Sequence, residues 1–306
     1  MRVDRAQLPW SPDAQAGSIH KSRFRVGGVS VQLVGSSEAD VALVPALEAF
    51  RAGGETCDIN VEVGWAARLA AASEPELFDS GSVWRVYRGD SGFQFDFSAP
   101  VLGRDPYRRL LVDEKFCRCS LFLNREYRAS HAAPLDYPLD ELLITHRLTQ
   151  ERAIELHGVG IVGPDGASNL FVGHSGAGKS TTARLWTAHH DVEILSDDRI
   201  IVRDEGTRIF MYGTPWHGEA AFASPAQAPL QRICILEHGN GNVLTRLSPS
   251  QAVAELFARS FVPFHRHEYV EGALAFLQHV AVSVPCYRYF FEPDERAVER
   301  ILNFRD

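Results

Sequence analysis

One run of nine residues constrains this chain more than any other, and it reads Gly173-His174-Ser175-Gly176-Ala177-Gly178-Lys179-Ser180-Thr181. A glycine, four further residues and then Gly-Lys-Ser is the pattern of a loop that binds phosphate groups. The glycines allow a tight turn that directs several backbone N–H groups toward anionic oxygens. Lys179 would add a charge at the terminal phosphates, and the Ser180 hydroxyl can ligate Mg²⁺. The nine residues therefore predict a binding site for nucleotide phosphates and magnesium.

The sequence on either side of the loop supports this interpretation. Residues 168–172 end in an apolar run, as a buried strand would, and residues 181–190 are compatible with a helix. A helix N-terminus favours anions because its first N–H groups are unpaired and its dipole is positive there. A Gly- and Ser-rich turn can match the pattern by chance, but here strand, loop and helix agree.

Composition bounds the class of protein. The chain has 306 residues, 45% hydrophobic and 23% charged, which is ordinary for a globular protein. A net charge of −8 argues against a general binder of nucleic acid or membrane surfaces. We see neither an apolar run of membrane-spanning length nor a secretory signal. Five cysteines without CxxC spacing indicate a reduced chain, so we expect a cytoplasmic protein.

The pattern of the chain predicts two domains, a β-rich one over 1–134 and a nucleotide-binding one over 135–306. Strand candidates in the first half are 31–34, 41–44, 83–87, 93–97, 110–112 and 116–123. Turn residues at 89–92 and 113–115 indicate two hairpins among them. We interpret the aromatic residues of these strands as core, because such residues are enriched in strands.

In the second half, Pro138 can start a helix that runs to about 148, although His146 interrupts its apolar stripe. Two short strands at 153–156 and 159–162 then precede the strand of the phosphate loop. Strands this closely spaced favour antiparallel pairing, because parallel neighbours need a long crossover. We therefore expect a mixed sheet in an α/β fold, rather than a doubly wound parallel sheet.

An acidic pair follows the next strand candidate, at 192–195. Asp197 and Asp198 come about eighteen residues after Lys179, where an acid can reach the Mg²⁺ directly or through water. One carboxylate, assigned here to Asp197 together with Ser180, would hold the metal, and the other would take a proton from an attacking hydroxyl. Neighbours at a strand end point to opposite sides, so the two roles are geometrically compatible.

Three signals in order resemble the bacterial HPr serine kinase/phosphorylase family and its shorter HPr-kinase-like relatives. They are His157-Gly158-Val159, the loop from Gly173 to Ser180, and Asp197-Asp198-Arg199. That family is related to the nucleotide domain of ATP-dependent phosphoenolpyruvate carboxykinases. The resemblance implies a C-terminal P-loop kinase domain that uses ATP and Mg²⁺. It also implies that His157 assists proton handling and that one of the two aspartates is the base for a serine.

The chain departs from the HPr kinases in two places. Thr181 and Thr182 stand where those kinases have Glu after the loop, and their Glu-Ile-Arg-Gly-Leu-Gly-Ile-Ile signature is absent. The segment 214–219 stands in its place and resembles short relatives found beside peptide-modification genes, which argues against HPr as the substrate. Within it, Trp216, His217 and Glu219 either contact substrate or belong to a loop held by a buried Trp.

The sequence therefore predicts an ATP-dependent kinase acting on a Ser or Thr hydroxyl of a peptide or small protein. Two alternatives stay open: a small-molecule kinase similar to adenylylsulfate kinases, and a non-catalytic nucleotide-binding protein of a biosynthetic cluster. The expected partner is the peptide or protein substrate, with no nucleic acid and no membrane. The β-rich half could recruit a peptide by strand addition. Assembly as a homo-oligomer is compatible with the sequence, which leaves the oligomeric state and the identity of the phosphate donor undecided.

Overall fold

The computed structural model describes residues 18–89, 91–103, 105–130, 133–164, 166–189 and 191–304. The chain divides into two compact units. The first is built from the described parts of 1–23, 31–44 and 53–136, and the second from 24–30, 45–52 and 137–306. Two short N-terminal segments thus belong with the C-terminal part of the chain.

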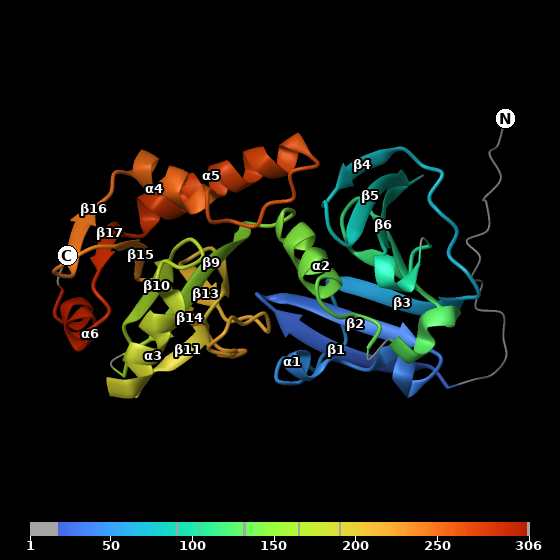
Figure 1. Ribbon diagram of the computed structural model, residues 1–306, viewed down its shortest axis with the longest axis horizontal. Helices are drawn as coiled ribbons and strands as arrows, with labels where there is room; N and C mark the ends of the chain where they lie inside the picture. Colours follow the sequence, from blue (N-terminus) through green and yellow to red (C-terminus); the bar gives the residue numbers. More distant parts are fainter. Residues whose placement is uncertain are drawn as a thin grey trace. The chain divides into compact units, whose positions relative to one another are not determined.

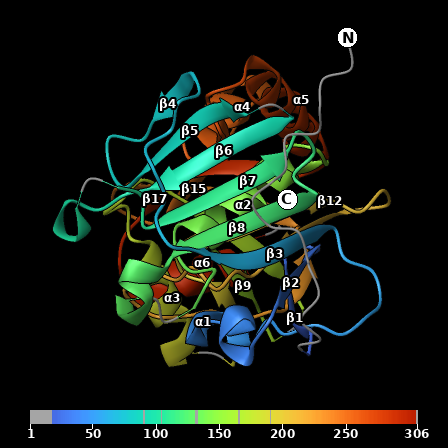
Figure 2. The ribbon, with the colours of Figure 1, turned by 90° about the vertical axis from the view of Figure 1, so that its right-hand side faces the viewer.

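The first half of the chain forms one eight-stranded sheet, whose strands lie side by side in Figure 2 in the order β1-β2-β3-β8-β7-β6-β5-β4. Its strands are β1 His20–Val26, β2 Val29–Gly35, β3 Ile59–Ala66, β4 Glu76–Asp79, β5 Trp84–Gly89, β6 Gly92–Phe97, β7 Arg108–Asp113 and β8 Arg118–Asn124. Between them lie the short helix α1 Pro45–Glu48 and the 3-10 helices Glu38–Val41, Pro100–Leu102 and Arg125–Ser130. The sheet is mixed, because β3 pairs in parallel with both β2 and β8 while β4 to β8 pair antiparallel.

Both predicted hairpins are present, as β5–β6 and β7–β8, and Phe93, Phe95 and Phe97 are buried as expected. The predicted strand at 41–44 is wrong. A 3-10 helix, Glu38–Val41, covers its start, and Leu43 makes only an isolated bridge to Leu135. The cause is local, because the Asp40 carboxylate accepts hydrogen bonds from the backbone of two preceding serines and thereby favours a turn.

The second half forms a nine-stranded sheet in the order β14-β13-β12-β9-β10-β15-β17-β16, with β11 paired to β9 off this path. Its strands are β9 Ala153–Val162, β10 Ser168–Val172, β11 Glu193–Ser196, β12 Arg199–Asp204, β13 Ile209–Tyr212, β14 Gln227–Pro229, β15 Arg232–His238, β16 Val243–Arg246 and β17 Cys286–Phe291. Its helices are α2 Leu139–Leu148, α3 Lys179–His189, α4 Pro249–Phe257, α5 His267–Ser283 and α6 Glu295–Leu302. The sheet is mixed: β10, β15 and β17 are parallel, and β9 runs antiparallel to β10 as predicted.

The strands expected at 153–156 and 159–162 are one continuous strand, β9. Its first half pairs with β12 and its second half with β10 and β11. Glycines near the middle of this strand serve close packing. A Cβ on Gly158 would lie 3.0 Å from the Phe171 carbonyl oxygen, so a side chain there would crowd the neighbouring strand.

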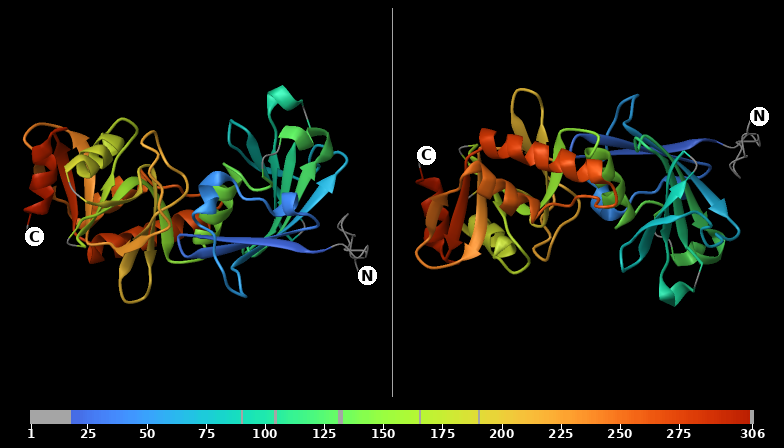
Figure 3. Two further views of the ribbon diagram at one scale, coloured as in Figure 1. Left: turned by 90° about the horizontal axis from the view of Figure 1, so that it is seen from below. Right: turned by 90° about the horizontal axis from the view of Figure 1, so that it is seen from above.

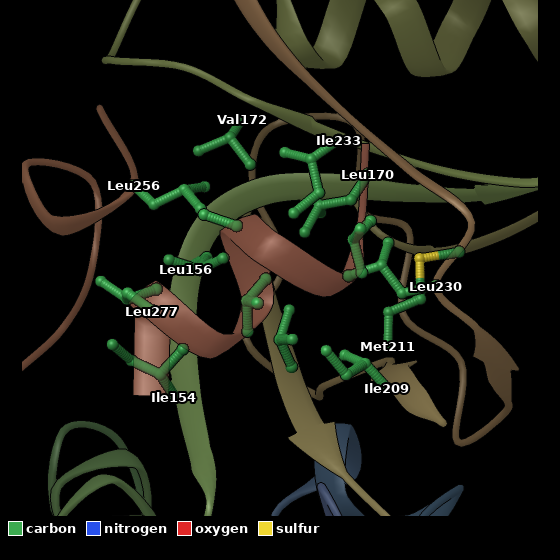
Figure 4. Packing of buried hydrophobic residues seen from close by; sticks show 14 of the residues in the cluster. Ile154, Leu156, Leu170, Val172, Ile209, Met211, Leu230, Ile233, Leu256 and Leu277 are labelled. Atoms are coloured by element: carbon green, nitrogen blue, oxygen red, sulfur yellow. The ribbon is translucent and has the colours of Figure 1, made fainter. Parts of the chain in front are cut away.

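Helices cover both faces of the second sheet (Figure 1). On one face, α4 and α5 pack on alternate strand residues such as Leu170 and Val172, in the cluster that Figure 4 shows. On the other face, α3 and α6 pack on the residues between them, such as Phe171. Because successive strand residues point to opposite faces, the same strands supply both cores. Figure 3 shows α4 and α5 along their length.

Helix signals in the sequence are realised with small shifts. The helix predicted from Pro138 is α2, and His146 on its stripe is buried in the core at 1% exposure. Ser248 caps α4 by accepting a hydrogen bond from the Gln251 amide, as its position predicted. None of the helices in the described chain combines the length and hydropathy that a membrane span needs. The five cysteines form no disulfide.

Candidate functional site

The phosphate-loop motif connects β10 to α3, both of which belong to the second unit. Gly176 and Gly178 have φ of +81° and +101°, a left-handed conformation that suits glycine. A Cβ on Gly178 would also lie 2.9 Å from the Phe291 ring. His174, Ser175 and Gly176 are exposed at the tip of the loop, as is Thr181 on the first turn of α3. The sequence thus forms the turn that the motif requires, at the N-terminus of a helix.

Lys179 lies inside this loop with only 6% of its surface exposed. Its Nζ donates to the carbonyl oxygens of Gly173 and His174, both at 3.0 Å. Burial lowers the pKa of Lys179 to about 8, against the opposing attraction of Asp198. A buried ammonium held by neutral carbonyls is an unusual arrangement, and an anionic ligand at the loop would stabilise its charged form.

Asp197 joins the phosphate loop to the segment that follows β13. Its Oδ1 accepts from the amides of Gly218 at 2.9 Å and Phe222 at 3.2 Å. Its Oδ2 accepts from the Ala220 amide at 2.9 Å and from the Ser180 hydroxyl at 3.3 Å. The four acceptor positions of the carboxylate are therefore filled by protein donors. Ala221, between two of these amides, has a φ of +59°, so the segment accepts backbone strain to wrap the carboxylate.

Asp198 has different partners although it is the next residue. Its Oδ1 lies 2.8 Å from His157 Nε2, and its Oδ2 forms an ion pair with Arg199. Burial raises the pKa of Asp198, but the His157 hydrogen bond and the Arg199 charge outweigh this and lower it overall. Asp198 is therefore held ionised beside an imidazole, an arrangement that can accept a proton.

Backbone hydrogen bonds place this pair beside the loop. The Gly158 amide donates to the Asp198 carbonyl oxygen at 3.0 Å, and the Gly173 amide donates to the His157 carbonyl oxygen at 3.3 Å. Asp198, His157 and Gly173 consequently lie on adjacent elements. The structure brings together the loop, the acidic pair and the histidine that the sequence singled out.

A network of buried charges behind Arg199 was not foreseen from the sequence. The Arg199 Nε lies 2.8 Å from Glu141 Oε1 and 3.4 Å from Glu155 Oε1, and its guanidinium stacks 4.0 Å from the Phe261 ring centre. Burial and the neighbouring Glu141 raise the pKa of Glu155 well above its usual value. Glu155 could have been noticed as the one acid within an apolar strand, Ala153–Val162, but Glu141 carried no such signal.

The three candidate residues in the segment after β13 differ in their exposure to solvent. Trp216 is 8% exposed, and its indole Nε1 donates to Asp140 on α2 at 3.0 Å. His217 and Glu219 are exposed, two residues apart on the segment that wraps Asp197. Trp216 thus acts as an internal support of this segment, while His217 and Glu219 lie on the surface next to the site.

The donors at the loop fit a nucleotide and its magnesium ion. A phosphate chain would meet inward-facing amides, a buried ammonium and a helix N-terminus, which are the groups that bind such anions. In the described chain no group of three His, Cys, Asp or Glu side chains is placed to hold a metal by itself. Mg²⁺ keeps several waters and phosphate oxygens as ligands, so Ser180 as a direct ligand, with Asp197 behind it, suits this ion.

No protein-family model matches this chain, and no curated protein sequence matches it. Among solved structures, it is similar to the Hpr(Ser) kinase/phosphatase from Coxiella burnetii, with a TM-score of 0.29 and 12% identity. The match covers 48% of this chain and 93% of that chain. This is a weak structural similarity to a kinase/phosphatase. At such a TM-score it says nothing of activity, which must be inferred from the residues of the site.

Proposed function

We propose that this protein is an ATP-dependent kinase that phosphorylates a Ser or Thr hydroxyl of a peptide or small protein. The observation that carries the proposal is the junction of two features. A glycine loop with a buried lysine adjoins an ionised Asp198 that is hydrogen-bonded to His157. The first feature binds phosphates, and the second accepts a proton, so together they supply the two needs of phosphoryl transfer.

In this reaction the acceptor hydroxyl oxygen forms a bond to the γ-phosphorus as the bond to the β,γ-bridging oxygen breaks. ADP leaves with that oxygen, and the hydroxyl proton passes to the Asp198–His157 pair. Asp198 suits the role of base because Asp197 already accepts four hydrogen bonds. Lys179 offsets charge on the terminal phosphates. Ser180 and Asp197 would hold Mg²⁺, whose chemistry here is to neutralise phosphate charge.

Two features favour a peptide or protein acceptor. The Asp-Asp-Arg block resembles that of protein serine kinases rather than that of adenylylsulfate kinases. The chain also has an eight-stranded sheet, most of which lies outside the nucleotide-binding unit, and this is more than a small metabolite requires. We infer that this sheet contributes to recognition of the acceptor.

The first test measures nucleotide binding through the change in melting temperature that millimolar Mg-ATP causes. A ligand at a hundredfold its Kd stabilises the folded state by about 2.7 kcal/mol, so the wild type should melt at a higher temperature with Mg-ATP. Lys179→Ala should lose this shift. Lys115→Ala, at an exposed lysine in the turn between β7 and β8, is the matched control and should keep it. An equal shift in the wild type and Lys179→Ala would show that the site is misassigned.

The second test is transfer. Candidate peptides and free hydroxyl metabolites are incubated with the protein and Mg-ATP, and mass spectrometry measures the gain of one phosphate. Phosphate on peptide Ser or Thr supports the proposal. Phosphate only on a metabolite indicates a small-molecule kinase, and nucleotide binding without any transfer indicates a non-catalytic protein.

A further inference from the structure

The backbone of Arg259 lies next to His157, which borders the phosphate loop, although 77 residues of chain separate Arg259 from Thr181. After α4 the chain runs beside β9, where the His157 amide donates to the Arg259 carbonyl oxygen at 2.8 Å. The Phe261 amide donates to the Glu155 carbonyl oxygen at 3.0 Å in the same stretch. His157 is therefore bonded to Arg259 through its amide and to Gly173, the first residue of the loop, through its carbonyl oxygen.

The guanidinium of Arg259 is buried and only partly satisfied. The residue is 7% exposed. Its Nη1 donates to the Glu255 carbonyl oxygen at 2.8 Å and to the Glu255 carboxylate at 2.6 Å. Its Nε is buried without a hydrogen-bond partner. A buried donor left unpaired destabilises the folded state, so its presence near an anion-binding loop points to a ligand that would pair with it.

The charge of Arg259 acts on the loop itself. It is the largest cause of the lowered pKa of His174, ahead of burial. The Glu255 carboxylate, which accepts from Arg259 Nη1, acts on His174 in the opposite direction and offsets part of this charge. A bound anion with several negative charges would offset the positive charge that remains at the loop.

We infer that Arg259 binds the terminal phosphate of the nucleotide and stabilises it during transfer. This inference rests on the function proposed above. A guanidinium presents planar N–H donors that match two phosphate oxygens at once, and it stays charged at every physiological pH. Charge on the γ-phosphoryl oxygens is what an arginine offsets in enzymes of this chemical class. Glu255 holds the guanidinium in position before the nucleotide arrives.

The experiment compares the Kd of Mg-ATP with that of Mg-ADP by titration calorimetry on the full chain. The variants are Arg259→Gln and Arg259→Lys, and the matched control is Arg288→Gln. Arg288 shares the Glu255 carboxylate, at 2.7 Å, but is not among the main charges that shift the pKa of His174. Peptide phosphorylation and the melting temperature without nucleotide are measured on the same samples.

If Arg259 contacts the terminal phosphate, Arg259→Gln should weaken Mg-ATP at least about tenfold and leave Mg-ADP nearly unchanged, while turnover falls on the order of 10³-fold. Arg259→Lys should recover part of the ATP affinity, and Arg288→Gln should match the wild type. Equal effects on ATP and ADP, or none, would overturn the inference while leaving the kinase proposal standing. Loss of the fold in both Arg259 variants would assign Arg259 to the architecture and overturn it also. A wild type that binds neither nucleotide refutes both proposals.

Discussion

Asp40 in the first unit and Asp198 in the second unit are two carboxylates that are held by different kinds of partner. In the first unit Asp40 is 2% exposed. It accepts from the Trp65 indole at 2.8 Å, from the Ser37 amide at 2.9 Å, and from the amide and hydroxyl of Ser36 at 3.1 and 2.8 Å. All these donors are neutral, and most are neighbours in the sequence. Burial raises the pKa of Asp40, but these hydrogen bonds lower it overall.

In the second unit Asp198 belongs to a network of titratable side chains. Asp198 meets His157 and Arg199, and Arg199 also meets Glu141 and Glu155. These residues come from α2, β9, the turn between β11 and β12, and the start of β12. Neutral donors suffice to hold a carboxylate in a fold, whereas packing like and unlike charges together shifts their pKa values and is characteristic of reactive sites. We therefore contrast Asp40, a structural acid, with Asp198, the acid that we propose as the base.

The largest effect is expected for Asp198→Asn, which tests whether Asp198 differs in role from Asp40. An amide cannot accept the proton of the acceptor hydroxyl, so turnover should fall on the order of 10³-fold. Mg-ATP affinity should change little, because the loop and Lys179 are untouched. Steady-state kinetics and calorimetry on one preparation measure both. Near-normal turnover would show that the charged network is as structural as Asp40.

The second prediction concerns acid sensitivity, which we expect to arise in the second unit. Burial lowers the pKa of His146 from 6.5 to about 3 and that of His265 to about 4. Below pH 6.5 the unfolded chain takes up protons that the folded chain refuses, so stability must fall as pH falls toward 4. His146 alone should cost about 1.4 kcal/mol per pH unit, or about 3 kcal/mol by pH 4.

Denaturant unfolding between pH 7 and pH 4 measures this loss. His146→Leu, which cannot titrate, should show a shallower dependence than the wild type, and His267→Leu, an exposed histidine at the start of α5, should not differ from it. A stability that stays flat from pH 6.5 to 4.5 contradicts the burial of neutral histidines.

The third prediction concerns Asp197, which lies in the site but accepts hydrogen bonds from neutral donors, as Asp40 does. In Asp197→Asn the new NH₂ group faces amide donors that it cannot pair with, so the folded state should lose about 2 kcal/mol. The loss should be measurable as a lower denaturation midpoint. Mg-ATP binding should also weaken, since Ser180 loses its partner. Unchanged stability would mean that the amides around Asp197 are not held by it.

The smallest effect is expected for Asp40→Asn. It should cost about 1 kcal/mol of stability, because one neutral partner replaces another and part of the turn can readjust. Turnover per folded molecule should equal that of the wild type. A large loss of turnover in Asp40→Asn would contradict the structural role of Asp40 and show that the first unit contributes to catalysis.

Much of the site could be predicted because it is encoded by adjacent residues. The loop, its helix and the two hairpins depend on local turn chemistry and strand alternation, which the sequence displays directly. The predictions failed or stayed open where the structure of a segment depends on residues far away in the sequence. β9 was expected as two strands, because the neighbours that pair with it across the sheet are not visible in the sequence. Trp216 was ambiguous because its partner, Asp140, lies 76 residues away.

The amino-acid sequence by itself determined that a loop with the phosphate-binding pattern stands between a strand and a helix, and that an acidic pair follows the next strand. Only the tertiary structure decided how that pair divides, with Asp197 wrapped by amides and Asp198 set against His157 and Arg199. It also decided that Arg259 lies next to His157 at the edge of the loop. The reason is physical: backbone conformation depends on nearby residues, whereas the pKa and the partner of a buried charge depend on whatever side chains the sheet order brings beside it.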